Sequence, residues 1–397
     1  MLAAERVFGA GELTATVLLG ELGLDGRVRP VRGVLPATLA ASQAGFRRVI
    51  VPLSQASEAK LVEHIEVVGV ASLSQLIALF RGDPIPEVEQ TDLAEAPMRQ
   101  PQTGQLDFAD VFGQSEAKWA AEVAAAGRHH MLFHGPPGVG KTMIAQRVPG
   151  LLPDLTAQEA LEVSAIHSLA GFPLSDGLIR RPPYSDPHHS ASAASIVGGG
   201  QRMAKPGAIS CAHRGVLFLD EAPEFPPTVL EALRTPLESG VITLNRSEYE
   251  TRYPARFQLI MAANPCPCGM AATPGANCRC APAQIRRYTT KISLPIRDRI
   301  DIVQAFLPLS KAFLRAAAKQ PAEPSAAIAA RVAEARSRQA RRLAGTGWLT
   351  NGEVPGSYLT KHLPLPDGVH LLDDAVSRGR LSARGVHRVL RVACMEQ

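Results

Sequence analysis

The chain has 397 residues, of which 46% are hydrophobic and 20% charged, and its formal net charge is +5. This composition is typical of a globular protein, and the length allows two or three domains. No apolar run approaches the roughly 18 residues that suggest a membrane span, and the first residues lack the pattern of a signal peptide. We therefore expect a cytoplasmic protein with no membrane partner. The small positive charge is compatible with a polyanionic partner but does not require one.

The N-terminal part, residues 1–80, is predicted to form a small α/β domain. Residues 14–22 and 47–54 are strand-like, and residues 34–45 between them are helix-like. Residues 81–106 are rich in proline, glutamine and acidic residues and show no periodicity. This composition is typical of a linker between domains.

The remainder of the chain divides into an α/β part and a helical part. From residue 107 to residue 309, strand-like and helix-like segments alternate, which predicts a parallel sheet covered by helices. Residues 310–397 are mostly helical. Two of their segments, residues 325–345 and 371–393, carry apolar stripes with arginines between them.

Residues 131–142 read MLFHGPPGVGKT, an apolar strand that runs into the G-x-x-x-x-G-K-T pattern of a P-loop and is followed by a helix-like segment. The glycines of such a loop let backbone N–H groups approach phosphates, and the helix N-terminus adds a favourable dipole. Lys141 would reach the β- and γ-phosphates of ATP, and the Thr142 hydroxyl would bind Mg²⁺. The predicted nucleotide-binding residues are Gly135, Pro136, Pro137, Gly138, Val139, Gly140, Lys141, Thr142 and, from the next motif, Asp220.

Two further strands end in polar residues that fit the same site. The segment GVLFLDEAPEF, residues 215–225, predicts a buried strand that ends in Asp220 and Glu221. Asp220 would hold Mg²⁺ through water, and Glu221 would polarise the attacking water. The segment FQLIMAANP predicts a strand that ends in Asn264, either a sensor of the γ-phosphate or a plain strand cap.

Four of the six cysteines lie in residues 264–280, NPCPCGMAATPGANCRC, at Cys266, Cys268, Cys278 and Cys280. Four thiolates in two pairs can close a tetrahedral Zn²⁺ site with no open position, so such a metal would be structural. Free thiols and a redox switch are the alternatives.

These segments resemble an AAA+ ATPase of the magnesium chelatase type, and more narrowly the YifB/ComM proteins. The resemblance rests on DVFGQSEAKWAAEVAAAGRHHMLFHGPPGVGKT, PHHSASAASIVGGG, GVLFLDEAPEF, YPARFQLIMAANPCPCG and SARGVHRVLRVA, in that order within residues 107–393. It implies an AAA+ P-loop NTPase core at 107–309 and a C-terminal helical lid at 310–397. The N-terminal piece is similar to the second half of a Lon-protease-like (ribosomal S5 domain 2-like) domain. The resemblance implies that both ends are truncated.

The resemblance also implies a hexameric ring that binds ATP between subunits and, in ComM-type members, acts on DNA in branch migration. Matched by position, Arg299 would be an arginine finger and Arg384 the sensor-2 arginine on the helical lid. Considered without the resemblance, Arg299 would be part of a surface salt bridge and Arg384 a solvated helix arginine. Arg256 is a further candidate near the nucleotide. Residues 240–257 predict a β-hairpin, and Arg246 near its tip would contact DNA or be an exposed loop arginine.

Two alternative functions stay open beside this interpretation, and a third, proteolysis, does not. A protease is excluded, because the stretch GVLPATLAASQAG, where the catalytic lysine of a Lon-type Ser–Lys pair would lie, has no lysine. The chain could instead be a chelatase-like ATPase that remodels a protein partner, or an assembly-defective fragment that only binds nucleotide.

His188 and His189 are adjacent, so their side chains are expected to diverge. A pore or interface loop is therefore favoured over a two-histidine metal site.

Overall fold

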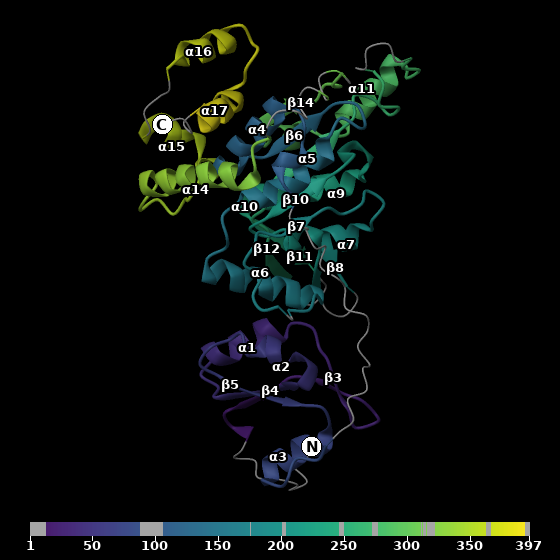
Figure 1. Ribbon diagram of the computed structural model, residues 1–397, viewed down its shortest axis with the longest axis vertical. Coiled ribbons are helices and arrows are strands. Elements are labelled where there is room, and N and C mark those ends of the chain that lie inside the picture. Colours follow the sequence, from purple (N-terminus) through teal and green to yellow (C-terminus); the bar gives the residue numbers. More distant parts are fainter. Residues whose placement is uncertain are drawn as a thin grey trace. The chain divides into compact units, whose positions relative to one another are not determined.

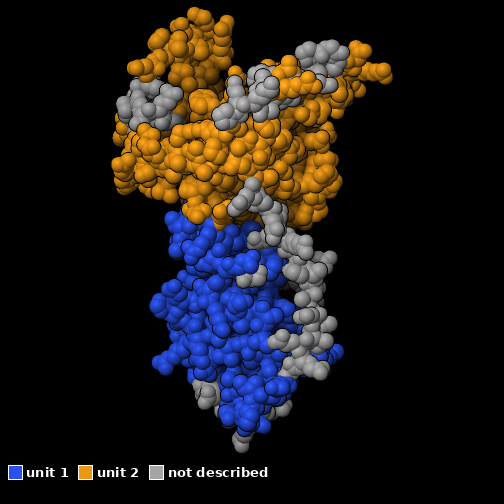
Figure 2. All heavy atoms as spheres, in the orientation of Figure 1, with its two compact units in different colours: residues 1–102, 155–180 blue, residues 103–154, 181–397 orange. Residues whose placement is uncertain are grey.

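The computed structural model describes residues 13–87, 106–174, 176–200, 204–245, 250–271, 277–310, 312, 315, 322–362 and 367–393. The chain forms two compact units, coloured separately in Figure 2. Unit 1 comprises residues 1–102 and 155–180, and unit 2 comprises residues 103–154 and 181–397. Residues 155–180, which the sequence alone assigns to the ATPase core, thus form a compact unit with the N-terminal residues.

Unit 1 contains a three-stranded parallel sheet in the order β1 (Thr16–Leu18), β4 (Arg48–Pro52) and β5 (Glu66–Val70). The valines of the central strand β4 are fully buried, as expected for a parallel strand covered on both faces. Helix α1 (Val34–Gln43) ends before Gly45, as predicted. The remaining elements are β2 (Glu21–Leu22), β3 (Val28–Arg29), η2 (Leu53–Gln55), α2 (Ala56–Ala59) and α3 (Leu73–Arg81).

Helix α6 (Ala157–Ala170) completes unit 1 by packing against α1. Its first turn is fixed by a capping box between Thr156 and Glu159. The buried carboxylate of Glu58 accepts hydrogen bonds from the Leu35 N–H (3.1 Å) and from the Ser168 hydroxyl (2.5 Å). This carboxylate therefore joins α1, α2 and α6.

Unit 2 is built on a five-stranded parallel sheet in the order β14-β6-β13-β10-β7 (Figure 1). The strands are β6 (Met131–His134), β7 (Tyr184–Ser185), β10 (Val216–Leu219), β13 (Gln258–Ala263) and β14 (Ile302–Ala305). Every residue of β10 and β13 is buried. The predicted parallel α/β core is therefore confirmed, and β6 lies between its two sequence-distant neighbours β13 and β14.

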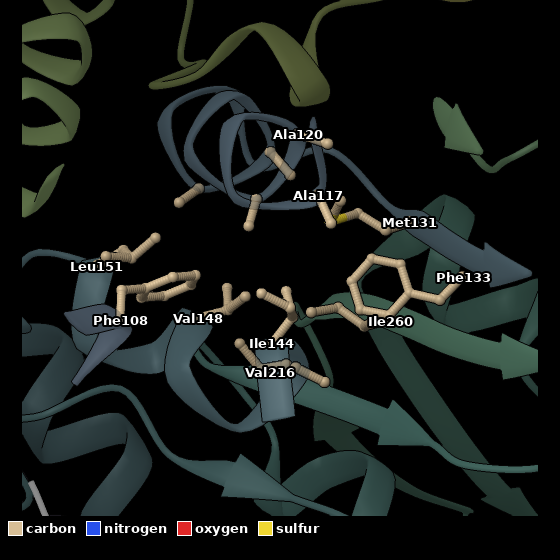
Figure 3. Packing of buried hydrophobic residues seen from close by; sticks show 14 of the residues in the cluster. Phe108, Ala117, Ala120, Met131, Phe133, Ile144, Val148, Leu151, Val216 and Ile260 are labelled. Atoms are coloured by element: carbon tan, nitrogen blue, oxygen red, sulfur yellow. The ribbon is translucent and has the colours of Figure 1, made fainter. Parts of the chain in front are cut away.

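The core of unit 2 forms between this sheet and helices α4 (Ser115–Gly127) and α5 (Lys141–Arg147). Figure 3 shows Ala117 and Ala120 of α4 above Ile144 and Ile260, with Met131 beside Ala117; all five are fully or nearly fully buried. Alanines let α4 approach the sheet closely, and each large buried aliphatic side chain contributes about 1.5–3 kcal/mol to stability.

Further elements of unit 2 are η3 (Phe108–Asp110), η4 (Val148–Leu151), α7 (Ala193–Val197), β8 (Gly198–Gly199), β9 (Lys205–Pro206), α8 (Ala208–Cys211), η5 (Ala222–Glu224), α9 (Pro227–Ala232), α10 (Arg234–Ser239), α11 (Pro282–Thr290) and α12 (Leu294–Arg297).

The predicted hairpin is present as the antiparallel pair β11 (Val241–Asn245) and β12 (Glu250–Pro254). Its tip, including Arg246, lies outside the described residues. No helix in the part of the chain that the structure describes is long and apolar enough to cross a membrane.

The C-terminal part is helical, as predicted, and consists of α14 (Ser325–Arg342), η6 (Asn351–Glu353), α15 (Gly356–His362), α16 (Val369–Ser377) and α17 (Ala383–Ala393). A buried ion network ties α17 to the sheet. Asp301, before β14, lies 3.0 Å from His129 Nδ1 and 3.4 Å from the Arg391 guanidinium. Burial alone would raise the pKa of Asp301, but His129 and Arg391 hold it below its usual value. The charged carboxylate therefore depends on both partners.

Candidate nucleotide site and cysteine centre

The P-loop connects β6 to α5 and lies at the carboxyl end of the parallel sheet, where ligands bind in open α/β folds. Gly138 and Gly140 have φ angles of 78° and 96°, which glycine adopts without strain. Gly135 is required for a different reason. A Cβ atom there would lie 2.5 Å from the Phe306 carbonyl oxygen, which follows β14. The loop is thus fitted closely against the edge strand.

Lys141 and Asn264, predicted from motifs 123 residues apart, are in contact. The Lys141 ammonium donates to Asn264 Oδ1 (2.7 Å), to the Pro136 carbonyl (3.1 Å) and to the Gly135 carbonyl. Burial lowers the pKa of Lys141, while the nearby Asp220 and Glu221 oppose this shift. The structure therefore brings the loop lysine and the end of β13 to one point.

Thr142 and Asp220 form the second contact at this point. The Thr142 hydroxyl donates to Asp220 Oδ2 (2.8 Å), and the Glu221 N–H donates to Asp220 Oδ1 (2.9 Å). A hydroxyl and a carboxylate are oxygen donors of the kind that Mg²⁺ prefers. Glu221 itself has φ of 50°, a conformation that is uncommon for residues other than glycine and that clusters at functional sites.

The structure places Arg299 and Arg384 near each other rather than at the P-loop. Arg299 contacts the Glu238 carboxylate and the Pro295 carbonyl, and Arg384 Nη1 lies 3.6 Å from Asp298 Oδ2. Burial lowers the pKa of Arg299, and the charges of Arg234 and Arg384 add to this shift. The Arg384 side chain is 74% exposed. These arginines therefore form a positive group beside α12.

Arg256 and two arginines of α14, Arg331 and Arg336, make contacts within the chain. The Arg256 backbone bonds to His213 and Arg214. Arg331 pairs with Glu122 (2.6 Å) and Glu323, and the Arg336 guanidinium donates to the Ala125 carbonyl. Two arginines of α14 are thus paired with groups of the same chain.

The four cysteines of the loop come together as predicted from their spacing. Their Sγ atoms all lie within 4.8 Å of one another, and three of the pairs are separated by 3.3, 3.7 and 3.8 Å. A tetrahedral site with Zn–S bonds of about 2.3 Å requires sulfur atoms about 3.8 Å apart. A backbone hydrogen bond with Met270 and contacts with the other thiols lower the pKa of Cys268 to about 6, so this thiol is readily deprotonated. The cluster fits a metal ion.

The cysteine loop contacts the P-loop directly. Gly269 has φ of 78°, and a Cβ atom there would lie 2.6 Å from Cδ of Pro137. At the other end, Cys266 is fully buried two residues after Asn264. The loop therefore adjoins the nucleotide site at both Pro137 and Asn264.

Two residues at the site were not predicted from their motifs. His189 Nδ1 lies 3.5 Å from Glu221 Oε2. Tyr288 of α11 is buried, which raises its pKa to about 12, and it lies close to the Asn264 backbone. The rings of His188 and His189 have centroids 4.2 Å apart. The expectation that these side chains diverge is wrong. Neighbouring side chains point to opposite sides only in an extended strand, whereas the chain turns at His189.

Comparison with protein families agrees with this geometry. Residues 107–312 match the family described as "Magnesium chelatase, subunit ChlI", residues 322–395 match "Magnesium chelatase, subunit ChlI C-terminal", and residues 2–55 match "Subunit ChlI of Mg-chelatase". The three matches together span both units of the chain.

Similar proteins cover nearly the whole chain. A Mycobacterium tuberculosis protein named "Uncharacterized protein Rv2897c" is 52% identical over 386 residues, 96% of this chain and 74% of its own length. "Competence protein ComM" of Haemophilus influenzae is 38% identical over 99% of this chain and 76% of its own. "Uncharacterized protein YifB" of Escherichia coli is 39% identical over 99% and 75%. The chain therefore belongs to the YifB/ComM group of magnesium chelatase-like AAA+ proteins.

Proposed function

We propose that this protein hydrolyses ATP with Mg²⁺ and that it works as a ring-shaped motor on DNA. The observation that carries the first part is the meeting of four predicted residues at one end of the sheet, through the contacts Lys141–Asn264 and Thr142–Asp220. Family membership supports an AAA+ ATPase.

In this proposal each residue has one task. Lys141 binds the β- and γ-phosphates, and Thr142 and Asp220 hold Mg²⁺, which neutralises phosphate charge when bound. Glu221 polarises the attacking water, and Asn264 senses the γ-phosphate through its contact with Lys141. The backbone N–H groups of the P-loop complete the phosphate site.

We further propose that the chain forms a hexameric ring in which Arg299 reaches the nucleotide of a neighbour. The grouping of Arg299 with Arg384 and Arg234 supports this role, because guanidinium groups bind phosphate well. Glu238, which contacts Arg299, is 65% exposed and could be displaced by that phosphate.

DNA is proposed as the substrate because one relative is named a competence protein and because the sequence between β11 and β12 contains a basic residue, Arg246. The internal pairing of Arg331 and Arg336 makes the helix of residues 331–342 a weaker candidate for DNA contact.

The test is the rate of ATP hydrolysis with no DNA, with single-stranded DNA and with a four-way junction, for the wild type and for Arg246→Ala. The proposal predicts that DNA stimulates the wild type and stimulates Arg246→Ala less, with equal basal rates. Hydrolysis that no DNA changes would overturn the DNA proposal and favour a motor that remodels a protein partner. The size of the particle with ATP, measured by light scattering, tests the ring; a monomer under all conditions would indicate an assembly-defective chain.

We also propose that the four cysteines bind one structural Zn²⁺. Their Sγ separations near 3.8 Å support this ligand set. A cytoplasmic location, which we propose with it, would keep these thiols reduced. Elemental analysis of purified protein should find about one zinc per chain, and less than a tenth of that in Cys278→Ser; equal metal content in both would contradict the site.

A further inference from the structure

The contact between His189 and Glu221 arises from two neighbouring strands of the sheet. Strands β7 and β10 are parallel, with Ser185 opposite Leu217. His189 and Glu221 each follow their paired residue by four positions, so they leave the same edge of the sheet side by side. His189 Nδ1 then lies 3.5 Å from Glu221 Oε2. The sheet register thus sets a histidine beside the carboxylate proposed to polarise water.

The contact with His189 is important because the local backbone does not fix the position of the Glu221 side chain. Its φ of 50° is a conformation that most residues avoid, and its carboxylate is about half exposed. The other charged groups close to it are Asp220, whose carboxylate accepts from the Glu221 N–H, and Lys141, on whose pKa Glu221 acts. Lys141 already donates to three other acceptors. Among the charged side chains of the residues that the structure describes, His189 alone lies within 4.0 Å of the Glu221 carboxylate.

His189 is itself held in place. Its ring lies 4.2 Å from the His188 ring, and its edge faces Phe225, with centroids 6.3 Å apart. Phe225 is buried at the end of η5, which directly follows Glu221. The His188 Nδ1 atom is 2.7 Å from the Ser190 hydroxyl, which fixes the turn. The His189 ring therefore packs beside His188 and Phe225, and its Nδ1 atom lies near the Glu221 carboxylate.

We infer that His189 is a positioning residue that holds the Glu221 carboxylate in the orientation needed to polarise water. This inference rests on the proposed ATP hydrolysis and adds a residue to it. His189 lies on the segment that leads from β7 to α7, so the same contact links that segment to the hydrolysis step. A group that orients a reacting carboxylate changes the chemical step and leaves nucleotide binding largely alone.

The test compares kcat and KM for ATP in the wild type, His189→Ala, His189→Asn and His188→Ala. We expect His189→Ala to lower kcat by about ten-fold with KM within about two-fold. His189→Asn, whose amide nitrogen takes the place of Nδ1, should recover most of the loss. His188→Ala, which removes the ring packed beside His189 but no contact with Glu221, should lower kcat less than His189→Ala does. Equal losses in His188→Ala and His189→Ala would overturn the inference, because they would indicate damage to the turn.

A double variant tests whether His189 acts on hydrolysis through Glu221 or independently of it. In the Glu221→Gln background, His189→Ala should cause less than a two-fold further loss, because the two residues act as one unit. Independent, multiplying losses would overturn the inference. If the wild type shows no ATP hydrolysis that Lys141→Ala abolishes, the proposed function and this inference both fail. If such hydrolysis is present but kcat of His189→Ala is unchanged, only the inference about His189 fails.

Discussion

The contact between the cysteine loop and the P-loop can be tested by adding one methyl group at Gly269. A Cβ atom there would lie 2.6 Å from Cδ and 3.0 Å from Cγ of Pro137. Carbon atoms pack optimally at about 3.5–4.0 Å, so one of the two loops has to move by about 1 Å. The proline ring cannot rotate away, because it is closed onto the P-loop backbone.

The substitution Gly269→Ala is expected to lower the free energy of unfolding for two reasons. The φ of 78° at Gly269 costs a residue other than glycine about 1–2 kcal/mol, and overpacking adds about 1–3 kcal/mol. Gly345 is a matched control, because its φ is 81° and a Cβ atom there would meet nothing within 4 Å. Gly345→Ala should therefore show the first cost alone.

The assays are denaturant unfolding and equilibrium binding of ATP. We expect Gly269→Ala to lose more stability than Gly345→Ala, by about 1–3 kcal/mol. We also expect it to bind ATP about ten-fold more weakly, equivalent to about 1.4 kcal/mol, because displacement of Pro137 disturbs the phosphate-binding backbone. If both variants bind ATP as tightly as the wild type does, the loops are not coupled and this reasoning is refuted.

Three further predictions concern Asn264, the cysteine cluster and His130. Asn264→Ala removes an acceptor of Lys141 and should lower kcat for ATP by about ten-fold or more in steady-state assays, whereas an unchanged kcat would exclude a sensor role. Removal of the metal with a chelator should lower both the melting temperature and ATP affinity, and added Zn²⁺ should restore both; a chelator without effect would argue against a structural metal. Burial lowers the pKa of His130 from 6.5 to about 4. The folded protein therefore disfavours protonated His130, and the free energy of unfolding is highest above pH 6.5. It decreases as the pH falls from 6.5 toward 4. Unfolding at pH 5 should show a loss of about 2 kcal/mol from this group, and His130→Asn, which keeps an acceptor for the Leu259 N–H, should lose correspondingly less.

The residues at the strand ends could be predicted from sequence because local pattern fixes them. An apolar strand followed by a glycine-rich turn or by Asp220 places polar groups at the carboxyl edge of a parallel sheet, whatever the rest of the chain does. The closeness of Lys141 to Asn264 follows from that rule once β6 and β13 are neighbours. The cysteine spacing was informative for the same reason, since two short pairs separated by a turn can meet only in a few ways.

Other features depend on packing between distant segments and could not be predicted. The association of α6 with the N-terminal residues rests on Glu58 and Ser168, which are 110 positions apart and belong to no motif. The pairing of Arg331 with Glu122 likewise joins residues 209 positions apart that belong to no common motif. The contact of His189 with Glu221 requires the register of β7 on β10, which strand propensity does not define.

The most direct test of the account is nucleotide binding and phosphate release measured together for the wild type, Lys141→Ala and Glu221→Gln. The account predicts that the wild type binds and hydrolyses Mg²⁺–ATP, that Lys141→Ala binds it weakly, and that Glu221→Gln binds it normally but releases phosphate at least about 100-fold more slowly. Phosphate release that neither substitution reduces would show that the activity does not come from this site and would contradict the account.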